Sequence, residues 1–283
     1  MPVPHDPHPF EHVTDSQTWE FFNAAFGDKV EWQLPVIHLP FTGRPFQITK
    51  FMILELVAAA LILLIYIPIA RRSAKGELPR GGWWNAFESL LTFVRNEIAR
   101  PNLGEHDADK YVPYLWTLFL FLLFCNLLGL LPFMGSPTAS IWMTGAMALI
   151  SFVMIHGAAI VKVGPVHYFQ SLWPPIDVPY VGWFFSLMIF VIEFISSFIK
   201  SGVLAIRLFA NMFAGHMVLA VILLFIYTAA KSGSLWLLGG VSFASVLGVV
   251  ALSLLELFVA FLQAYIFVFL TALFMGMSLH PEH

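Results

Sequence analysis

The chain has 283 residues, of which 59% are hydrophobic and only 11% are charged, and its mean hydropathy is +0.82. Soluble domains carry about 25% charged residues, so this composition excludes an ordinary soluble domain and indicates a protein of the bilayer. The net charge of -3 provides no basic surface for nucleic acid. A single cysteine, Cys125, leaves neither a disulfide framework nor a thiolate metal site available.

Residues 1–45 are polar and rich in proline, and they predict a flexible extramembrane tail. The histidines at positions 5, 8 and 12 could suggest a metal site, but the flanking prolines and the lack of cysteine favour the tail. The segment has no basic n-region and no early apolar region, so we expect no cleavable signal peptide. We expect no metal and no cofactor for the chain.

Three apolar segments lie between the tail and residue 162, and each reaches the roughly 20 residues that cross a membrane as a helix. The first is 51–70. The other two, 113–134 and 139–161, are separated only by "GSPT" and predict a helical hairpin over 113–161.

Residues 180–280 contain no proline, and their only break signals are "KSGS" at 231–234 and a Gly-Gly pair at 239–240. The pattern predicts two helices of up to about 50 and 40 residues, roughly 75 and 60 Å long. The hydrocarbon core is only about 30 Å thick, and nothing in the sequence kinks the helices. We therefore expect the pair 180–279 to be strongly tilted.

Between the first span and the hairpin, residues 83–101 alternate apolar and charged positions at helical spacing. This pattern predicts an amphipathic helix on the membrane surface. The predicted fold class is therefore an all-α integral membrane protein, with five crossings and one surface helix in a membrane domain over 46–283.

The distribution of lysine and arginine predicts the orientation, because these residues concentrate on the cytoplasmic side. They cluster in the 72–110 region and at the start of the 163–179 loop, which we assign to the cytoplasm. The N-terminus is then outside, and five crossings put the C-terminus inside. The clustered residues are Arg71, Arg72, Lys75, Arg80, Arg95, Arg100, Lys110 and Lys162.

Charged residues inside the first long helix are the main functional signal, because each costs about 2.5–3.5 kcal/mol to insert at the membrane centre. At 100° per residue, four polar side chains lie within about 40° of Arg207. The resulting stripe is about 27 Å long and predicts the wall of a water-filled pathway. His216 points about 180° away, toward a different compartment. The stripe comprises Glu193, Ser196, Lys200, Arg207 and Asn211.

The second long helix carries Glu256 and Gln263 on one face. If the helices turn back near 231–240, residues at equal distances from the turn are neighbours. His216 then meets Glu256, and Arg207 meets Gln263. A carboxylate beside an imidazole forms a titratable pair near neutral pH.

Simpler interpretations stay open for several of these groups. Glu193 and Lys200 could neutralise each other, and His216 could be a hydrogen-bonded core histidine. His156 could form a hydrogen bond within the 113–161 hairpin.

Arg207 is different, because no acidic residue lies one helical turn away. Its guanidinium keeps its proton at any pH that a protein meets. The counter-charge must come from Glu256, from elsewhere in the chain or from another subunit.

The segments "SGVLAIRLFANMFAGHMVL" (201–219) and "ELFVAFLQAYIFVFLTALFM" (256–275) resemble the two signature segments of subunit a of F-type ATP synthases. With the first span, the surface helix and the hairpin containing "NLLGLLP", the resemblance runs from about residue 45 to the C-terminus. It implies a non-catalytic stator in the lipid bilayer, whose partners are a ring of c subunits and b-type peripheral stalk subunits. Protons would be the translocated ion.

The resemblance also implies roles for individual residues. Arg207 matches the essential arginine that faces the ring carboxylate. Many bacterial members carry the acid and the imidazole of His216 and Glu256 in exchanged positions. The positions matching the outer half-channel are Asn211, His216, Glu256 and Gln263. Those matching the cytoplasmic half-channel are Glu193, Ser196 and Lys200.

Other functional classes fit less well. A secondary transporter predicts internal repeats and broken helices, which we do not find in the sequence. A channel predicts a ring of like residues from a symmetric oligomer, and a structural anchor predicts no ordered stripe. Phosphate-loop, nucleophile-elbow and HExxH motifs are absent from the sequence. We expect the chain in a bacterial inner membrane.

Overall fold

The computed structural model describes residues 18–21, 30–34, 36–38, 45–75, 81–131, 135–171, 182–231 and 234–280. Most of the predicted tail, with its three histidines, lies outside these ranges. The longer helices of the described part, in chain order, are α1 Lys50–Ala74, α2 Gly82–Phe93, α4 Glu105–Gly129, α5 Ile141–Val163, α6 Pro165–Ser171, α7 Gly182–Lys231 and α8 Leu235–Leu279. Shorter segments are the π-helix η1 Val94–Ala99, the helix α3 Arg100–Leu103 and the 3-10 helix η2 Pro137–Ala139.

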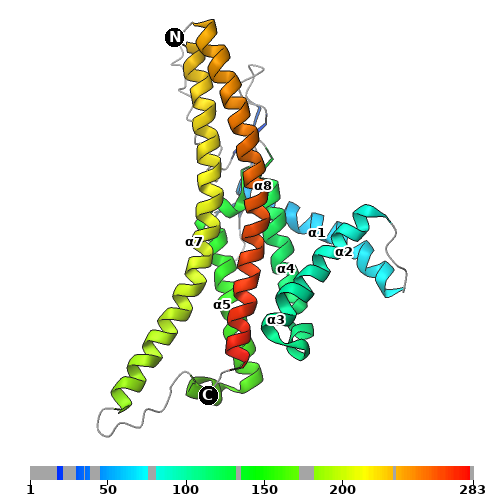
Figure 1. Cartoon of the computed structure of the whole chain (residues 1–283), viewed down its shortest axis with the longest axis vertical. Coiled ribbons are helices and arrows are strands. Elements are labelled where there is room, and N and C mark those ends of the chain that lie inside the picture. Colours follow the sequence, from blue (N-terminus) through cyan, green and yellow to red (C-terminus); the bar gives the residue numbers. More distant parts are fainter. Residues whose placement is uncertain are drawn as a thin grey trace. The chain divides into compact units, whose positions relative to one another are not determined.

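Five of these helices, α1, α4, α5, α7 and α8, are long and apolar enough to cross a membrane. The predicted all-α membrane fold with five spans is thereby confirmed for the described residues from 50 to 280. Figure 1 draws α7 and α8 each as one continuous helix, and they contain 50 and 45 residues. The Gly-Gly pair at 239–240 does not break α8, because α7 ends at Lys231 and α8 begins at Leu235. The tilt of the pair stays a prediction.

The segment before α1 contains short strands that the sequence analysis did not predict. β1 Thr18–Phe21 pairs antiparallel with β2 Val30–Gln33, and β3 Val36–His38 pairs antiparallel with β4 Pro45–Gln47. Valine, isoleucine and aromatic residues in these short stretches favour extended backbone. Each pair is a separate two-stranded sheet.

Helix boundaries differ from the predicted spans in ways that local chemistry explains. α4 begins at Glu105, eight residues before the predicted span, with Glu105 and Asp107 in its first turn. Acidic side chains stabilise a helix N-terminus, and they also keep this turn out of the apolar window. The predicted surface helix over 83–101 is helical from residue 82 to 103, interrupted by the π-helical segment.

The contacts divide the chain into two compact units, which are described separately. The first unit contains residues 1–64, 121–140 and 209–263, and the second contains 65–120, 141–208 and 264–283. In the second unit, α4 is the helix against which the surface helix packs. Val94 and Ile98 of η1 are fully buried, as are Leu115 and Phe119 of α4.

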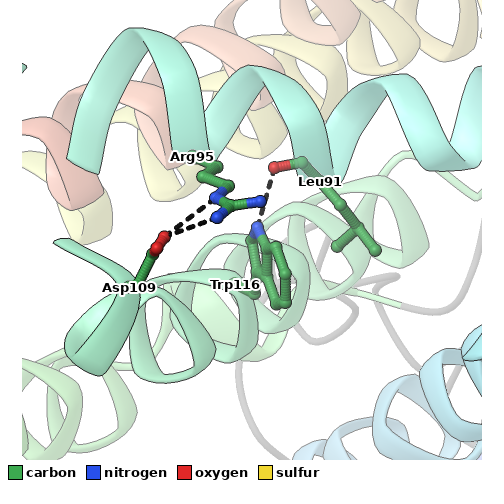
Figure 2. A network of polar contacts seen from close by, with 4 residues as sticks. All are labelled: Leu91, Arg95, Asp109 and Trp116. Carbon is green, nitrogen blue, oxygen red and sulfur yellow. Dashed lines mark hydrogen bonds and ion pairs between the residues drawn. The ribbon is translucent and has the colours of Figure 1, made fainter. Parts of the chain in front are cut away.

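Polar contacts fasten η1 and α2 to α4 in the second unit (Figure 2). Arg95 donates from Nε and a terminal nitrogen to Oδ1 of Asp109, at 3.0 and 2.7 Å. The indole nitrogen of Trp116 donates to the carbonyl oxygen of Leu91 at 2.7 Å. The ion pair is exposed and contributes little, whereas the part-buried indole bond contributes on the order of 1 kcal/mol.

We therefore expect Trp116→Phe to lower the free energy of unfolding by about 1 kcal/mol or more, because the Leu91 carbonyl loses its indole donor. The measurement is helicity, followed by circular dichroism, during titration with dodecyl sulfate in mixed micelles. Trp83→Phe is the matched control, since Trp83 lies on α2 and is 82% exposed. Equal unfolding midpoints for both variants would contradict the role of this hydrogen bond.

Candidate functional site

In the first unit, α7 and α8 run antiparallel with a nearly constant register. Met212 and Ala260 are buried in one apolar cluster with Ala139 of η2. Farther toward the turn, Gly248 lies opposite Ile222, with 3.8 Å between Cδ1 of Ile222 and the Cβ position of residue 248. These pairs have almost the same mean residue number, as expected for two antiparallel helices in constant register.

This register joins two of the predicted site residues directly. The side-chain amide of Asn211 donates to Oε1 of Gln263 at 3.0 Å. Gln263 is only 3% exposed, so the bond satisfies a buried amide oxygen. The structure pairs Gln263 with Asn211, which lies one turn farther along α7 than Arg207. The expected meeting of Gln263 with Arg207 stays a prediction.

The carboxylate of Glu256 lies against the backbone of Gly215, the residue before His216. A Cβ at position 215 would overlap Oε1 of Glu256 and would lie 3.1 Å from its Cδ. Glycine therefore leaves room for this position of the Glu256 side chain, although the helix itself would favour alanine. Glu256 therefore reaches α7 beside His216, and its predicted meeting with His216 itself stays a prediction. No hydrogen bond joins Glu256 to the His216 ring among the described residues.

A buried polar chain fixes α8 between Glu256 and Gln263. The amide of Asn126 donates to the carbonyl oxygen of Ala260 at 3.1 Å, and its own oxygen accepts from Thr138 at 2.8 Å. The hydroxyls of Thr138 and Ser136 are 2.7 Å apart, and all three side chains are fully buried. Their mutual hydrogen bonds replace the water that a buried polar group would otherwise need.

Lys50, at the start of α1, is a further charged group of this unit that the sequence analysis did not include. Its side chain is 4% exposed, and its ammonium interacts electrostatically with the ring of His216. The available sequence signal was a lysine directly before an apolar span. Its proximity to His216 could not be read from the sequence, because it depends on how α1 packs.

The second unit contains the other predicted residues. Arg207 is exposed, and no ion pair links it to a described acidic residue of this unit. Glu193 and Lys200 are exposed, and Ser196 is half-buried.

The alternative that Glu193 and Lys200 neutralise each other does not fit the described contacts of the second unit. No ion pair joins these two residues, and the ammonium of Lys200 lies over the ring of Phe274 at 5.3 Å from its centroid. The predicted cytoplasmic group is thus a set of accessible polar side chains along α7 rather than an internal salt bridge.

Comparison with known proteins identifies the family. The family described as ATP synthase A chain matches residues 52–276. ATP synthase subunit a of Anaeromyxobacter dehalogenans strain 2CP-C is 40% identical over 274 residues, which cover 95% of this chain and 69% of the relative. The chain belongs to this family. ATP synthase subunit a 2 of Chlorobaculum tepidum is 37% identical over 270 residues, covering 94% of this chain and 71% of the relative.

Family membership and the five apolar helices together make the chain a multi-pass membrane protein. The relative from Myxococcus xanthus, also named ATP synthase subunit a, is 38% identical over 239 residues, which cover 84% of this chain and 74% of that protein. The family match spans both units and contains all eight of the predicted site residues, from Glu193 to Gln263.

The Asn211–Gln263 hydrogen bond predicts an energetic coupling between α7 and α8. Asn211→Ala should lower the free energy of unfolding by about 1 kcal/mol, because it leaves the buried Gln263 oxygen without its donor. Gln263→Ala should have less effect once Asn211 is already replaced, giving a coupling energy of about 0.5–1.5 kcal/mol. The measurement is a double-mutant cycle in mixed micelles, and strictly additive effects would contradict a direct bond.

Proposed function

We propose that the chain is the proton-conducting stator subunit of an F-type ATP synthase, itself non-catalytic, which passes protons to and from the carboxylates of a rotating c ring. The observation that carries the proposal is the pairing of α7 with α8 in the first unit. It brings Asn211 to Gln263 and the Glu256 carboxylate to Gly215, beside His216. Carboxylate, imidazole and amide side chains at successive turns are the groups that a proton path across hydrocarbon requires.

The outer half-channel consists of Asn211, His216, Glu256 and Gln263. Protons from outside reach Glu256 and His216, two groups that can bind and release them near neutral pH. The amides of Asn211 and Gln263 cannot titrate, and they hold the facing helices while offering hydrogen bonds to water. A proton leaving this path neutralises a ring carboxylate, which can then rotate into lipid at low cost.

The cytoplasmic half-channel consists of Glu193, Ser196 and Lys200. The exposure of Glu193 and Lys200 in the second unit supports contact with water. A ring carboxylate that arrives here after nearly a full turn loses its proton to this water. The membrane potential supplies about 2.3 kcal/mol per proton per 100 mV for the cycle.

Arg207 is the charge barrier between the two paths. Its guanidinium stays protonated, so it attracts the ionised ring carboxylate but cannot relay a proton itself. Its exposure, with no acidic partner among the described residues of its unit, supports a counter-charge supplied by the ring. Peripheral stalk subunits of the b type hold the chain against rotation. We place it in a bacterial inner membrane, with the N-terminus outside and the C-terminus in the cytoplasm.

Arg207→Ala tests the barrier in membranes that contain the whole complex. We expect proton-driven ATP synthesis to be abolished, while ATP hydrolysis by the detached head persists. Arg100→Ala is the control, because Arg100 is an exposed arginine outside the spans. Normal synthesis by the Arg207→Ala complex would overturn the proposed function.

Gly215→Ala tests the outer half-channel without removing a titratable group. The added methyl displaces the flexible Glu256 carboxylate. Alanine also favours the helix over glycine by up to about 1 kcal/mol, so we expect the complex to assemble normally. Passive proton flux through vesicles stripped of the head should fall at least about tenfold, because the displaced carboxylate no longer lies in its proton-transfer position.

Gly248→Ala is the matched control for this prediction. Its Cβ would meet only Cδ1 of Ile222, at an ordinary contact distance of 3.8 Å. Glu256→Leu should reproduce the loss of flux. If Gly215→Ala and Glu256→Leu both conduct protons at the wild-type rate, the outer half-channel has been assigned to the wrong residues.

A further inference from the structure

His156 is an ionisable side chain within α5 that the proposed half-channels do not use, and both of its ring nitrogens have partners in the second unit. Nδ1 forms a short contact with the hydroxyl of Tyr168, and Nε2 lies 2.9 Å from Oγ of Ser197. The ring of Phe152 lies edge-on at a centroid distance of 4.2 Å. The sequence analysis left open a hydrogen bond within the 113–161 hairpin, and the structure provides partners from α6 and α7.

A sharp turn after α5 brings Tyr168 back to His156. Gly164 has φ +91°, a conformation that favours glycine, and its amide donates to the carbonyl oxygen of Ile160 at 3.0 Å. Pro165 then opens α6, and the Tyr168 amide donates to the Gly164 oxygen at 2.9 Å. Tyr168 is consequently 7% exposed, with its hydroxyl directed at the imidazole.

On α7, Ser197 lies one turn after Glu193, so both belong to the same side of the helix. Ser197 also directly follows Ser196 of the proposed cytoplasmic half-channel. The charge of Glu193 acts on the Tyr168 hydroxyl. The groups therefore form a row that begins at Ser197 of α7, passes through the ring of His156 and ends at Tyr168, on which the charge of Glu193 acts.

The chemistry of the row permits proton transfer in either direction. A hydroxyl can donate or accept, and a neutral imidazole donates at one nitrogen while it accepts at the other. Burial, and then the negative charge of Glu193, raise the pKa of Tyr168 above its ordinary value. The phenol therefore keeps its proton and can pass one on only as it receives another.

We propose that His156 relays protons between Ser197 and Tyr168, as a section of the cytoplasmic half-channel built from α5 and α6 that lies in series with its other groups. This inference rests on the proposed function of that half-channel. In one transfer, Nε2 accepts a proton from the Ser197 hydroxyl, which takes a replacement from channel water. Nδ1 releases its proton to the Tyr168 oxygen as the phenolic proton leaves for water or Glu193. The ring stays neutral and ends in its other tautomer.

The test compares His156→Gln with the wild type in inverted membrane vesicles carrying the assembled complex. A glutamine can still bond both hydroxyls, but it cannot exchange a proton from one side to the other. After the head is removed, we expect passive proton flux driven by a potassium diffusion potential to fall about tenfold. Tyr168→Phe should cause a similar loss, and the double variant should be no slower than either, because the groups act in series.

Two further measurements separate a relay from a structural bridge. His156→Ala should regain flux when imidazole is added, since a free base can replace the missing one. His167→Gln is the control, because His167 is an exposed histidine on α6 beside Tyr168. Subunit abundance in the membrane is measured for every variant. Should His156→Gln fail to assemble, the flux of Tyr168→Phe decides between the two possibilities.

Wild-type flux in His156→Gln, or in Tyr168→Phe, would overturn the relay. A reduced flux in His156→Ala that imidazole does not restore would also overturn it, and would assign the ring a structural role. Glu256→Leu, measured in parallel, distinguishes the two proposals. If Glu256→Leu blocks flux and His156→Gln does not, only the relay is wrong. If Glu256→Leu also conducts normally, the outer half-channel itself is wrong.

Discussion

Hydrocarbon offers no hydrogen bonds, so every polar group that this chain carries across a membrane must find a partner inside the protein or an aqueous path. The first unit satisfies this constraint by pairing. Asn126 bonds a helix carbonyl oxygen and a threonine hydroxyl, and Asn211 bonds Gln263. These bonds fix the rotation of α8 against its neighbours, and that rotation aims the Glu256 carboxylate at α7.

The register of α7 and α8 depends on small residues as much as on polar ones. Ala260 packs with Met212 in one buried cluster, and Gly215 leaves room for the Glu256 side chain. A larger residue at either place would separate the helices or push the carboxylate out. The same close approach that excludes lipid from this seam therefore also brings together the groups of the proposed outer half-channel.

Much of this arrangement could be predicted from the sequence, because length and periodicity determine helices in a membrane. The absence of proline over 180–280 predicts two very long helices, and equal distance from their turn predicts that Glu256 meets α7 near His216. The details depend on tertiary contacts instead. Nothing local in the sequence shows that Gln263 bonds Asn211. Nothing local shows that a glycine-proline turn returns Tyr168 to His156.

Polar side chains of α7 differ in whether they have a hydrogen-bond partner within the described chain. This difference distinguishes one side of the helix from another. Ser197 already bonds the His156 ring inside the second unit, whereas Arg207 is exposed beside Ile206, which is 59% exposed. Lipid would accept the isoleucine and reject the guanidinium. A surface that presents the permanent charge of Arg207 beside an exposed apolar side chain matches a partner of the same character, an apolar helix surface that carries a carboxylate. The proposed contact with a c ring depends on this match. Each arriving carboxylate gives up its bound water only where the Arg207 guanidinium takes the place of that water.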